Sequence, residues 1–282
     1  MYKRIVSVVL MLVLVLGVTV AVFAAASITD ATREAVAKAA EAVESAEQIY
    51  QKLKSAVMEE LTAFDSEEED EDEFDIDEAM ALQKEMDGYA IQLSGLLSGL
   101  DGLPDNPDTS DGMTVLATRE YLSMLRNMVN DLSELIGYSA ELNLAMEAMI
   151  GTFGDDDIFE DYEEYSEILW VGCEDTRESL SKIKPPSYLE ITHRDLIQRV
   201  TEFRDFAEDF YLASVLGDPL RIYSCVYRLN RISRMFGICG DNLNADLELQ
   251  LHQAERRLNG PVEVLRGELT SNIAALKKAL GE

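Results

Sequence analysis

The chain has 282 residues, with 24 Lys and Arg against 54 Asp and Glu, which gives a formal net charge of −30. This excess of acid argues against naked nucleic acid as a partner, because phosphate binding needs a basic face. With 47% hydrophobic residues, the chain is too apolar for wholesale disorder and long enough to bury a sizeable core. Aromatic residues make up only 7%, and Ala, Leu, Glu and Met are abundant, which favours helices over strands.

The N-terminal segment, residues 1–26, has the layout of a secretory signal. Lys3 and Arg4 precede an apolar stretch, residues 5–26, that ends in three alanines suited to cleavage. The stretch is also long enough to cross a bilayer, so an uncleaved membrane anchor is the alternative. In both cases we expect residues 27–282 to be a single extracytoplasmic domain, either secreted or held at the membrane.

Apolar residues recur at spacings of three and four between the prolines, which predicts an array of helices. The predicted helices cover residues 30–64, 77–100, 114–150, 159–182, 187–216 and 219–258, followed by a short terminal helix to 280. Ser187 and Asp218 are the expected N-caps of the fifth and sixth helices, and residues 259–261 are expected to end the sixth. The sequence thus predicts an all-α fold, an elongated up-down bundle of four to six principal long helices.

Two predicted connections are strongly acidic. Residues 65–78 hold eleven acids in fourteen positions, and the connection at 154–167 holds eight in the thirteen positions 155–167. Such runs repel themselves and are usually solvated linkers, but clustered carboxylates also suit Ca²⁺. Neither run has the glycine of a twelve-residue calcium loop, so any binding is expected to be weak and to involve no resident cofactor. The candidate metal ligands are Asp70, Glu71, Asp72, Asp155, Asp156 and Asp157.

The predicted topology gives these acidic runs a common position. If successive helices alternate in direction, both connections emerge at the same end of the bundle. The result would be an acidic pole that attracts divalent cations or a basic protein partner.

Residues 219–240 contain four arginines and no acid, the reverse of the rest of the chain. One interpretation pairs these arginines with acids of the preceding helix, which are Glu202, Asp205, Glu208 and Asp209. The other is an anion-binding patch, which suits the fork geometry of arginine. Aromatic residues also gather in this part of the chain, where core packing is the simpler explanation. The alternative is a small-ligand cleft lined by Trp170, Arg221, Tyr223, Tyr227 and Arg228.

The three cysteines allow at most one internal disulfide. Cys225 and Cys239 are about 21 Å apart along one helix, so any bridge would join Cys173 to one of them. The alternative is that all three are small core residues.

The sequence shows no pattern typical of a common enzyme class. Only two histidines are present, and no zinc-helix motif, phosphate loop, dinucleotide fingerprint or serine-hydrolase elbow occurs. We therefore expect a non-enzymatic, exported helical-bundle protein of the cell envelope, acting as a structural or interaction module with an acidic pole. The alternative is an extracytoplasmic, sensor-like domain that binds a small ligand between the last three long helices. A carboxylate enzyme is the third and weakest hypothesis.

Overall fold

The computed structural model describes residues 30–65, 75–150 and 162–281, which form helices and short connections without any strand. The elements are α2 (Asp30–Asp65), α3 (Ile76–Gly99), α4 (Ser110–Ile150), α5 (Tyr162–Leu180), α6 (Glu190–Val215), α7 (Pro219–Arg257), the π-helical turn η2 (Leu258–Val262) and α8 (Glu263–Leu280). The predicted all-helical fold is confirmed, and each predicted boundary except the break at residues 259–261 lies within four residues of the observed one. The segment expected to be a signal or anchor lies outside the described residues.

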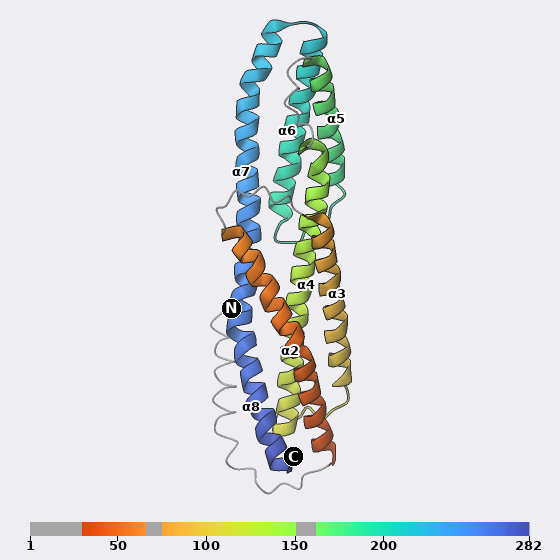
Figure 1. Cartoon of the computed structure of the whole chain (residues 1–282), viewed down its shortest axis with the longest axis vertical. Helices are drawn as coiled ribbons and strands as arrows, with labels where there is room; N and C mark the ends of the chain where they lie inside the picture. Colours follow the sequence, from red (N-terminus) through yellow and green to blue (C-terminus); the bar gives the residue numbers. More distant parts are fainter. Residues whose placement is uncertain (1–29, 66–74, 151–161, 282) are drawn as a thin grey trace.

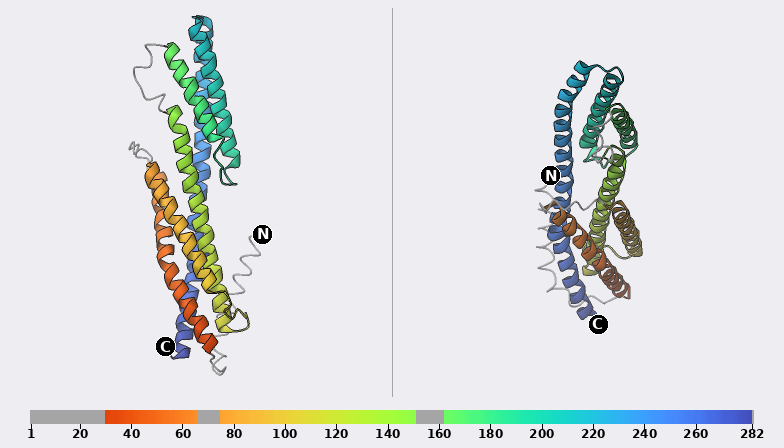
Figure 2. Two further views of the ribbon diagram at one scale, coloured as in Figure 1. Left: turned by 90° about the vertical axis from the view of Figure 1, so that its right-hand side faces the viewer. Right: turned by 45° about the horizontal axis from the view of Figure 1, so that its top comes forward.

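The helices form one elongated assembly in which consecutive helices from α2 to α7 alternate in direction along the long axis, and α8 continues the direction of α7 (Figure 1). As drawn there, α2, α3, α8 and the first part of α4 occupy the lower half, and α5, α6 and the first part of α7 occupy the upper half (Figure 2). α4 joins the halves, because it contacts α2, α3 and α8 as well as α5. α7 and α8 together traverse the whole length of the molecule.

The core follows the apolar seam that the spacing predicts. The side chains of Leu122, Leu125 and Val129 on α4 are fully buried, as are those of Leu53 and Val57 on α2. Removing one such side chain from water contributes about 1.5–3 kcal/mol. Because α2 packs against α4, α7 and α8, this seam joins the beginning of the described chain to its end.

The two predicted N-caps have different outcomes. The Asp218 side chain accepts hydrogen bonds from the backbone N–H groups of Leu220 and Arg221, so this cap is confirmed. The prediction for Ser187 is wrong, because α6 begins at Glu190 and its N-cap residue makes no side-chain bond. The reason is local: the N–H of Leu189 donates to the carbonyl of Pro186 at 2.9 Å, so Ser187 lies within this turn rather than at the start of the helix.

The prediction that residues 259–261 end a helix is also wrong, because α7 continues through η2 into α8. Proline normally breaks a helix, since it lacks an N–H and its ring meets the carbonyl four residues earlier. Here the turn widens, and the N–H of Glu263 reaches back to the carbonyl of Leu258, five residues earlier. The wider turn accommodates Pro261, and residues 219–280 form one rod about 90 Å long.

Gly112, in the first turn of α4, lies against the preceding loop with no room for a side chain. A Cβ at this position would lie 2.2 Å from the backbone oxygen of Asn106 and 2.6 Å from its backbone nitrogen. We expect Gly112→Ala to lower the free energy of unfolding by about 2 kcal/mol, the range typical of an overpacked site.

The matched control for Gly112→Ala is Gly95→Ala in α3, where a Cβ would meet no atom within 4 Å. Urea unfolding should show that this variant is more stable than the wild type by about 0.5–1 kcal/mol, because alanine is the better helix former. Equal stability of the two variants would contradict the close contact at Gly112.

Candidate functional site

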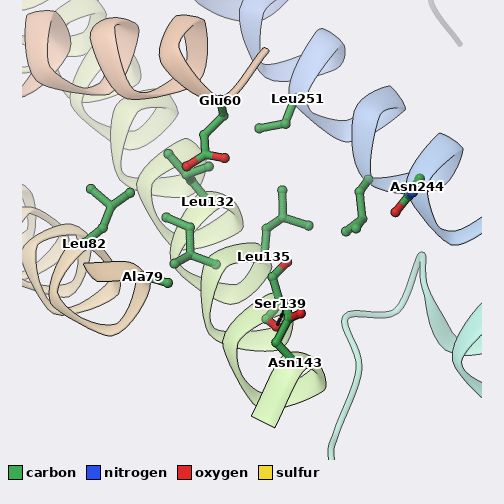
Figure 3. Close-up of a pocket in the computed structure, with 11 residues that line it drawn as sticks. Glu60, Ala79, Leu82, Leu132, Leu135, Ser139, Asn143, Asn244 and Leu251 are labelled. Carbon is green, nitrogen blue, oxygen red and sulfur yellow. Dashed lines mark hydrogen bonds between the residues drawn. The ribbon is translucent and has the colours of Figure 1, made fainter. Parts of the chain in front are cut away.

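A cavity of about 360 Å³ lies between four helices of the bundle. It lies between the end of α2, the beginning of α3, the middle of α4 and the second half of α7 (Figure 3). Its lining residues are Glu60, Ala79, Leu82, Leu132, Leu135, Ile136, Ser139, Asn143, Asn244, Leu247 and Leu251. A volume above about 300 Å³ with a mainly aliphatic wall is typical of sites for small organic ligands.

Glu60 is the only charged residue among the described residues of the lining. It is partly buried, and Figure 3 shows its carboxyl group extending from α2 toward the leucines of α4. It forms no hydrogen bond or ion pair with another described residue. Burial raises its pKa above the ordinary carboxyl value, and the nearby charges of Glu59 and Glu78 raise it further.

The remaining polar groups lie at the opposite side of the cavity from Glu60 (Figure 3). The side-chain amide of Asn143 donates to the carbonyl of Ser139 at 2.9 Å, so that its own oxygen can still accept a hydrogen bond. Asn244 contributes a second amide from α7. The cavity therefore combines an apolar wall with one unpaired carboxyl group and a few hydrogen-bonding groups, and its lining includes no histidine, cysteine or lysine.

No sequence motif identifies Glu60 as a site residue, but the helical spacing of α2 carries a signal for it. On α2 the buried side chains include Leu53, Val57 and Leu61, which follow one face of the helix. Glu60 comes three residues after Val57 and therefore lies close to this face. An acid at such a spacing indicates a carboxyl group turned partly toward the interior.

The structure does not gather the five residues of the predicted ligand cleft into one site. Trp170 is partly buried and stacks on Tyr211 of α6, with ring centroids 5.9 Å apart. Tyr223 and Tyr227 are exposed, and their positions place them on the outward side of α7. Of the two arginines of that prediction, Arg221 is exposed and Arg228 pairs with an acid of α6.

The expected pairing of the α7 arginines with α6 acids is confirmed only for Arg228 and Asp209. Most of the other acids on α6 are neutralised by arginines of α6 itself. Arg199 binds Glu202 at 2.8 Å, and Arg204 binds Glu208 at 3.4 Å. These short sequence separations could have been recognised beforehand, because residues three and four apart on a helix are neighbours.

All three cysteines are buried free thiols, so no disulfide joins Cys173 to Cys225 or Cys239. The alternative interpretation, that all three belong to the core, is the one that the structure shows. Burial raises the pKa of the Cys173 thiol to about 12 and that of Cys239 to about 11. The thiolate is the reactive form of cysteine, so burial and a raised thiol pKa do not favour Cys173 or Cys239 as a nucleophile.

The six candidate metal ligands, Asp70, Glu71, Asp72, Asp155, Asp156 and Asp157, lie outside the described residues. Within the described ranges, no group of three or more His, Cys, Asp or Glu side chains could hold a metal ion. The helices that lead into the two acidic runs, α2 and α4, point the same way, as expected. However, α4 ends farther along the long axis than α2, so these two helix ends are not level (Figure 1).

None of the helices in the described ranges combines the length and apolar character needed to cross a membrane. Comparison of the chain with protein-family models, with curated proteins and with solved structures finds no match.

Proposed function

We propose that this protein is a non-catalytic helical-bundle protein of the cell envelope that binds a small amphiphilic cation in the cavity beside Glu60. The observation that supports the proposal is the Glu60 carboxyl group, unpaired among the described residues, beside a mainly aliphatic wall. A ligand with an apolar body and one ammonium group would bury its body against the leucines. It would also supply the counter-charge that no described residue gives Glu60. The exported location rests on the N-terminal sequence pattern.

The test uses three probes of the same length that differ only in the head group: octylamine, 1-octanol and octanoate. We expect octylamine to raise the melting temperature most and octanoate least, because the carboxylates of the probe and of Glu60 repel each other. Glu60→Gln should weaken octylamine binding by about tenfold and leave 1-octanol binding nearly unchanged, since it removes one charge-assisted contact. Isothermal calorimetry measures both affinities.

Two matched variants on α3 show whether the probes enter the cavity. Ala79 lines the cavity, whereas Ala81 is exposed on the same helix. Ala79→Phe should fill the space and abolish binding of octylamine and 1-octanol, while Ala81→Phe should bind as the wild type does. If Ala79→Phe binds octylamine with the wild-type affinity, the cavity is not the binding site and the proposal fails.

A structural or interaction role with an acidic surface is the second proposal. It is supported by the concentration of eleven acids in residues 65–78 and by the net charge of −30. Calorimetric titration of the full chain with Ca²⁺ at two ionic strengths tests this role. Binding that saturates and survives added salt would favour a cation-binding surface, and a response erased by salt would contradict one.

A further inference from the structure

The first half of α7 presents a continuous exposed face, which we call the α7 stripe. It consists of Leu220, Tyr223, Tyr227, Arg231, Arg234 and Ile238. At 100° per residue these six positions fall within about 80° of one another, on the side opposite the buried Cys225 and Leu243. Leu220, Tyr223 and Tyr227 are 81%, 76% and 79% exposed. These large side chains project from the fold instead of packing in it.

The charge of the α7 stripe is reversed relative to the rest of the chain. Arg231 and Arg234, and the adjacent Arg221, form no ion pair with any described residue. Asp209 of α6 pairs with Arg228, and Asp218 accepts the first N–H groups of α7. Three arginines therefore have no ion-pair partner among the described residues of a protein of net charge −30.

The α7 stripe begins at one end of the long axis, where α6 turns into α7 (Figure 1). The last turn of α6 adds the exposed side chains of Leu212, Val215 and Leu216 beside it. The acidic first turn of α5, with Glu163 and Glu164, lies at the same end, but α6 packs between α5 and α7 and separates these acids from the α7 stripe. The reversed charge can thus act locally despite the net negative charge.

The side chains exposed at this end, which are leucine, tyrosine and arginine, are the types that bind the surface of a lipid bilayer. Leucine and tyrosine partition into the boundary between lipid head groups and acyl chains, and arginine reaches the phosphates from its apolar stem. Apolar side chains that project from the protein can insert into a deformable lipid layer, whereas a protein partner would have to offer a matching pocket. Unpaired arginines additionally require that this surface be negative.

We propose that the α7 stripe and the adjoining end of α6 dock on an anionic lipid surface. The leucines and tyrosines enter the head-group region, and Arg221, Arg231 and Arg234 bind lipid phosphates. This contact is separate from the cavity and does not depend on how residues 1–26 are processed. It would place the long axis at an angle to the membrane, with the α6–α7 end toward the lipid.

The test measures flotation of the full chain with two kinds of preformed vesicle. One is phosphatidylcholine alone and the other is equal parts phosphatidylcholine and phosphatidylglycerol. The triple change of Arg221, Arg231 and Arg234 to Gln should weaken binding to the anionic vesicles by roughly a hundredfold, since each arginine contributes roughly fivefold. Added salt should weaken the wild type more than this variant.

The matched control changes three other arginines with no ion pair to a described residue, Arg33, Arg194 and Arg256, to Gln. It alters the net charge by the same amount and should bind anionic vesicles as the wild type does. If both triple variants lose binding equally, the effect comes from overall charge and the proposal is overturned.

A fluorophore at the docking end separates this contact from any binding by the N-terminal segment. Because the three native thiols are buried, Leu220→Cys can be labelled with an environment-sensitive nitrobenzoxadiazole dye. Its emission should rise and shift to the blue on anionic vesicles only. Unchanged emission from vesicle-bound protein would overturn the proposal. The proposal would also be overturned if analytical sedimentation showed that the wild-type chain is a dimer and that substitutions in the α7 stripe make it a monomer.

Discussion

Replacing His193 by leucine is expected to lower the free energy of unfolding by about 2 kcal/mol at neutral pH and to reduce its dependence on pH. The imidazole is buried where three helices meet. Its Nε2 lies 3.1 Å from the carbonyl oxygen of Leu180, and its Nδ1 lies 3.2 Å from the hydroxyl of Tyr138. A carbonyl oxygen can only accept, so Nε2 carries the proton and Nδ1 accepts from the tyrosine. Leucine would leave the buried Tyr138 hydroxyl unpaired.

The expected pH dependence follows from the same environment. Burial lowers the pKa of His193 below its ordinary value near 6.5, although the hydrogen bond to Leu180 opposes this shift. The unfolded state then binds more protons than the folded state once the pH falls below about 6.5. This contribution to stability is therefore complete above that pH and is lost as the pH falls toward the lowered pKa.

Urea unfolding at several pH values between about 5 and 8 measures both effects. The control is His252→Gln, which leaves the contacts of His193 with Leu180 and Tyr138 in place. This variant should still lose the His193 contribution to stability as the pH falls below about 6.5. Tyr138→Phe in the His193→Leu background should recover part of the lost stability. If the stability losses of the two single variants simply add in the double variant, the hydrogen bond between the two side chains is contradicted.

The second large effect is expected at the contact between α2 and α8. Replacing Arg266 by methionine should cost about 2–3 kcal/mol, because the guanidinium joins two acids and a tyrosine ring at once. It binds the Glu47 carboxylate at 2.9 and 3.0 Å and Glu263 at 2.6 Å, and its central carbon lies 5.0 Å from the centre of the Tyr50 ring. Methionine keeps most of the packing volume but leaves two carboxylates beside a buried ring.

Two tyrosines supply a matched pair for this contact. The Tyr50 hydroxyl donates to Glu263, and burial and that bond raise the pKa of Tyr50 to about 12. The Tyr121 hydroxyl is buried nearby without a hydrogen-bond partner among the described residues. Tyr50→Phe should therefore cost about 1–2 kcal/mol in urea unfolding, whereas Tyr121→Phe should cost nothing or stabilise slightly. Equal losses for the two would contradict this account.

Local features of the sequence predicted the helices well. The apolar spacing along α2 and α4 identifies the residues that are buried, and the Asp218–Pro219 pair fixes the start of α7. These signals work because side-chain spacing and helix capping act within a few residues. Local signals did not predict the continuous helix at Pro261, because the wider turn there depends on tertiary packing and not on the neighbouring residues alone.

The cavity could not be predicted in the same way, because it depends on how far apart α4 and α7 lie. Its lining joins Glu60 to Asn244 across more than half of the chain, and no periodicity within one helix encodes that separation. The residues of the predicted ligand cleft lie apart for a related reason. Residue type alone did not show that Tyr223 and Tyr227 face outward while Trp170 packs on Tyr211.

The long rod of α7, η2 and α8 has a consequence for the order in which the chain can fold as it is synthesised. Glu47 and Tyr50, among the earliest described residues, find their long-range side-chain partners in Glu263 and Arg266. A growing chain can close the α3–α4 and α5–α6 hairpins early, because those contacts are near in sequence. The part of α2 that packs on α8 must wait until the last helix has emerged. A chain truncated after α7 would therefore leave that part of α2 uncovered and prone to aggregate.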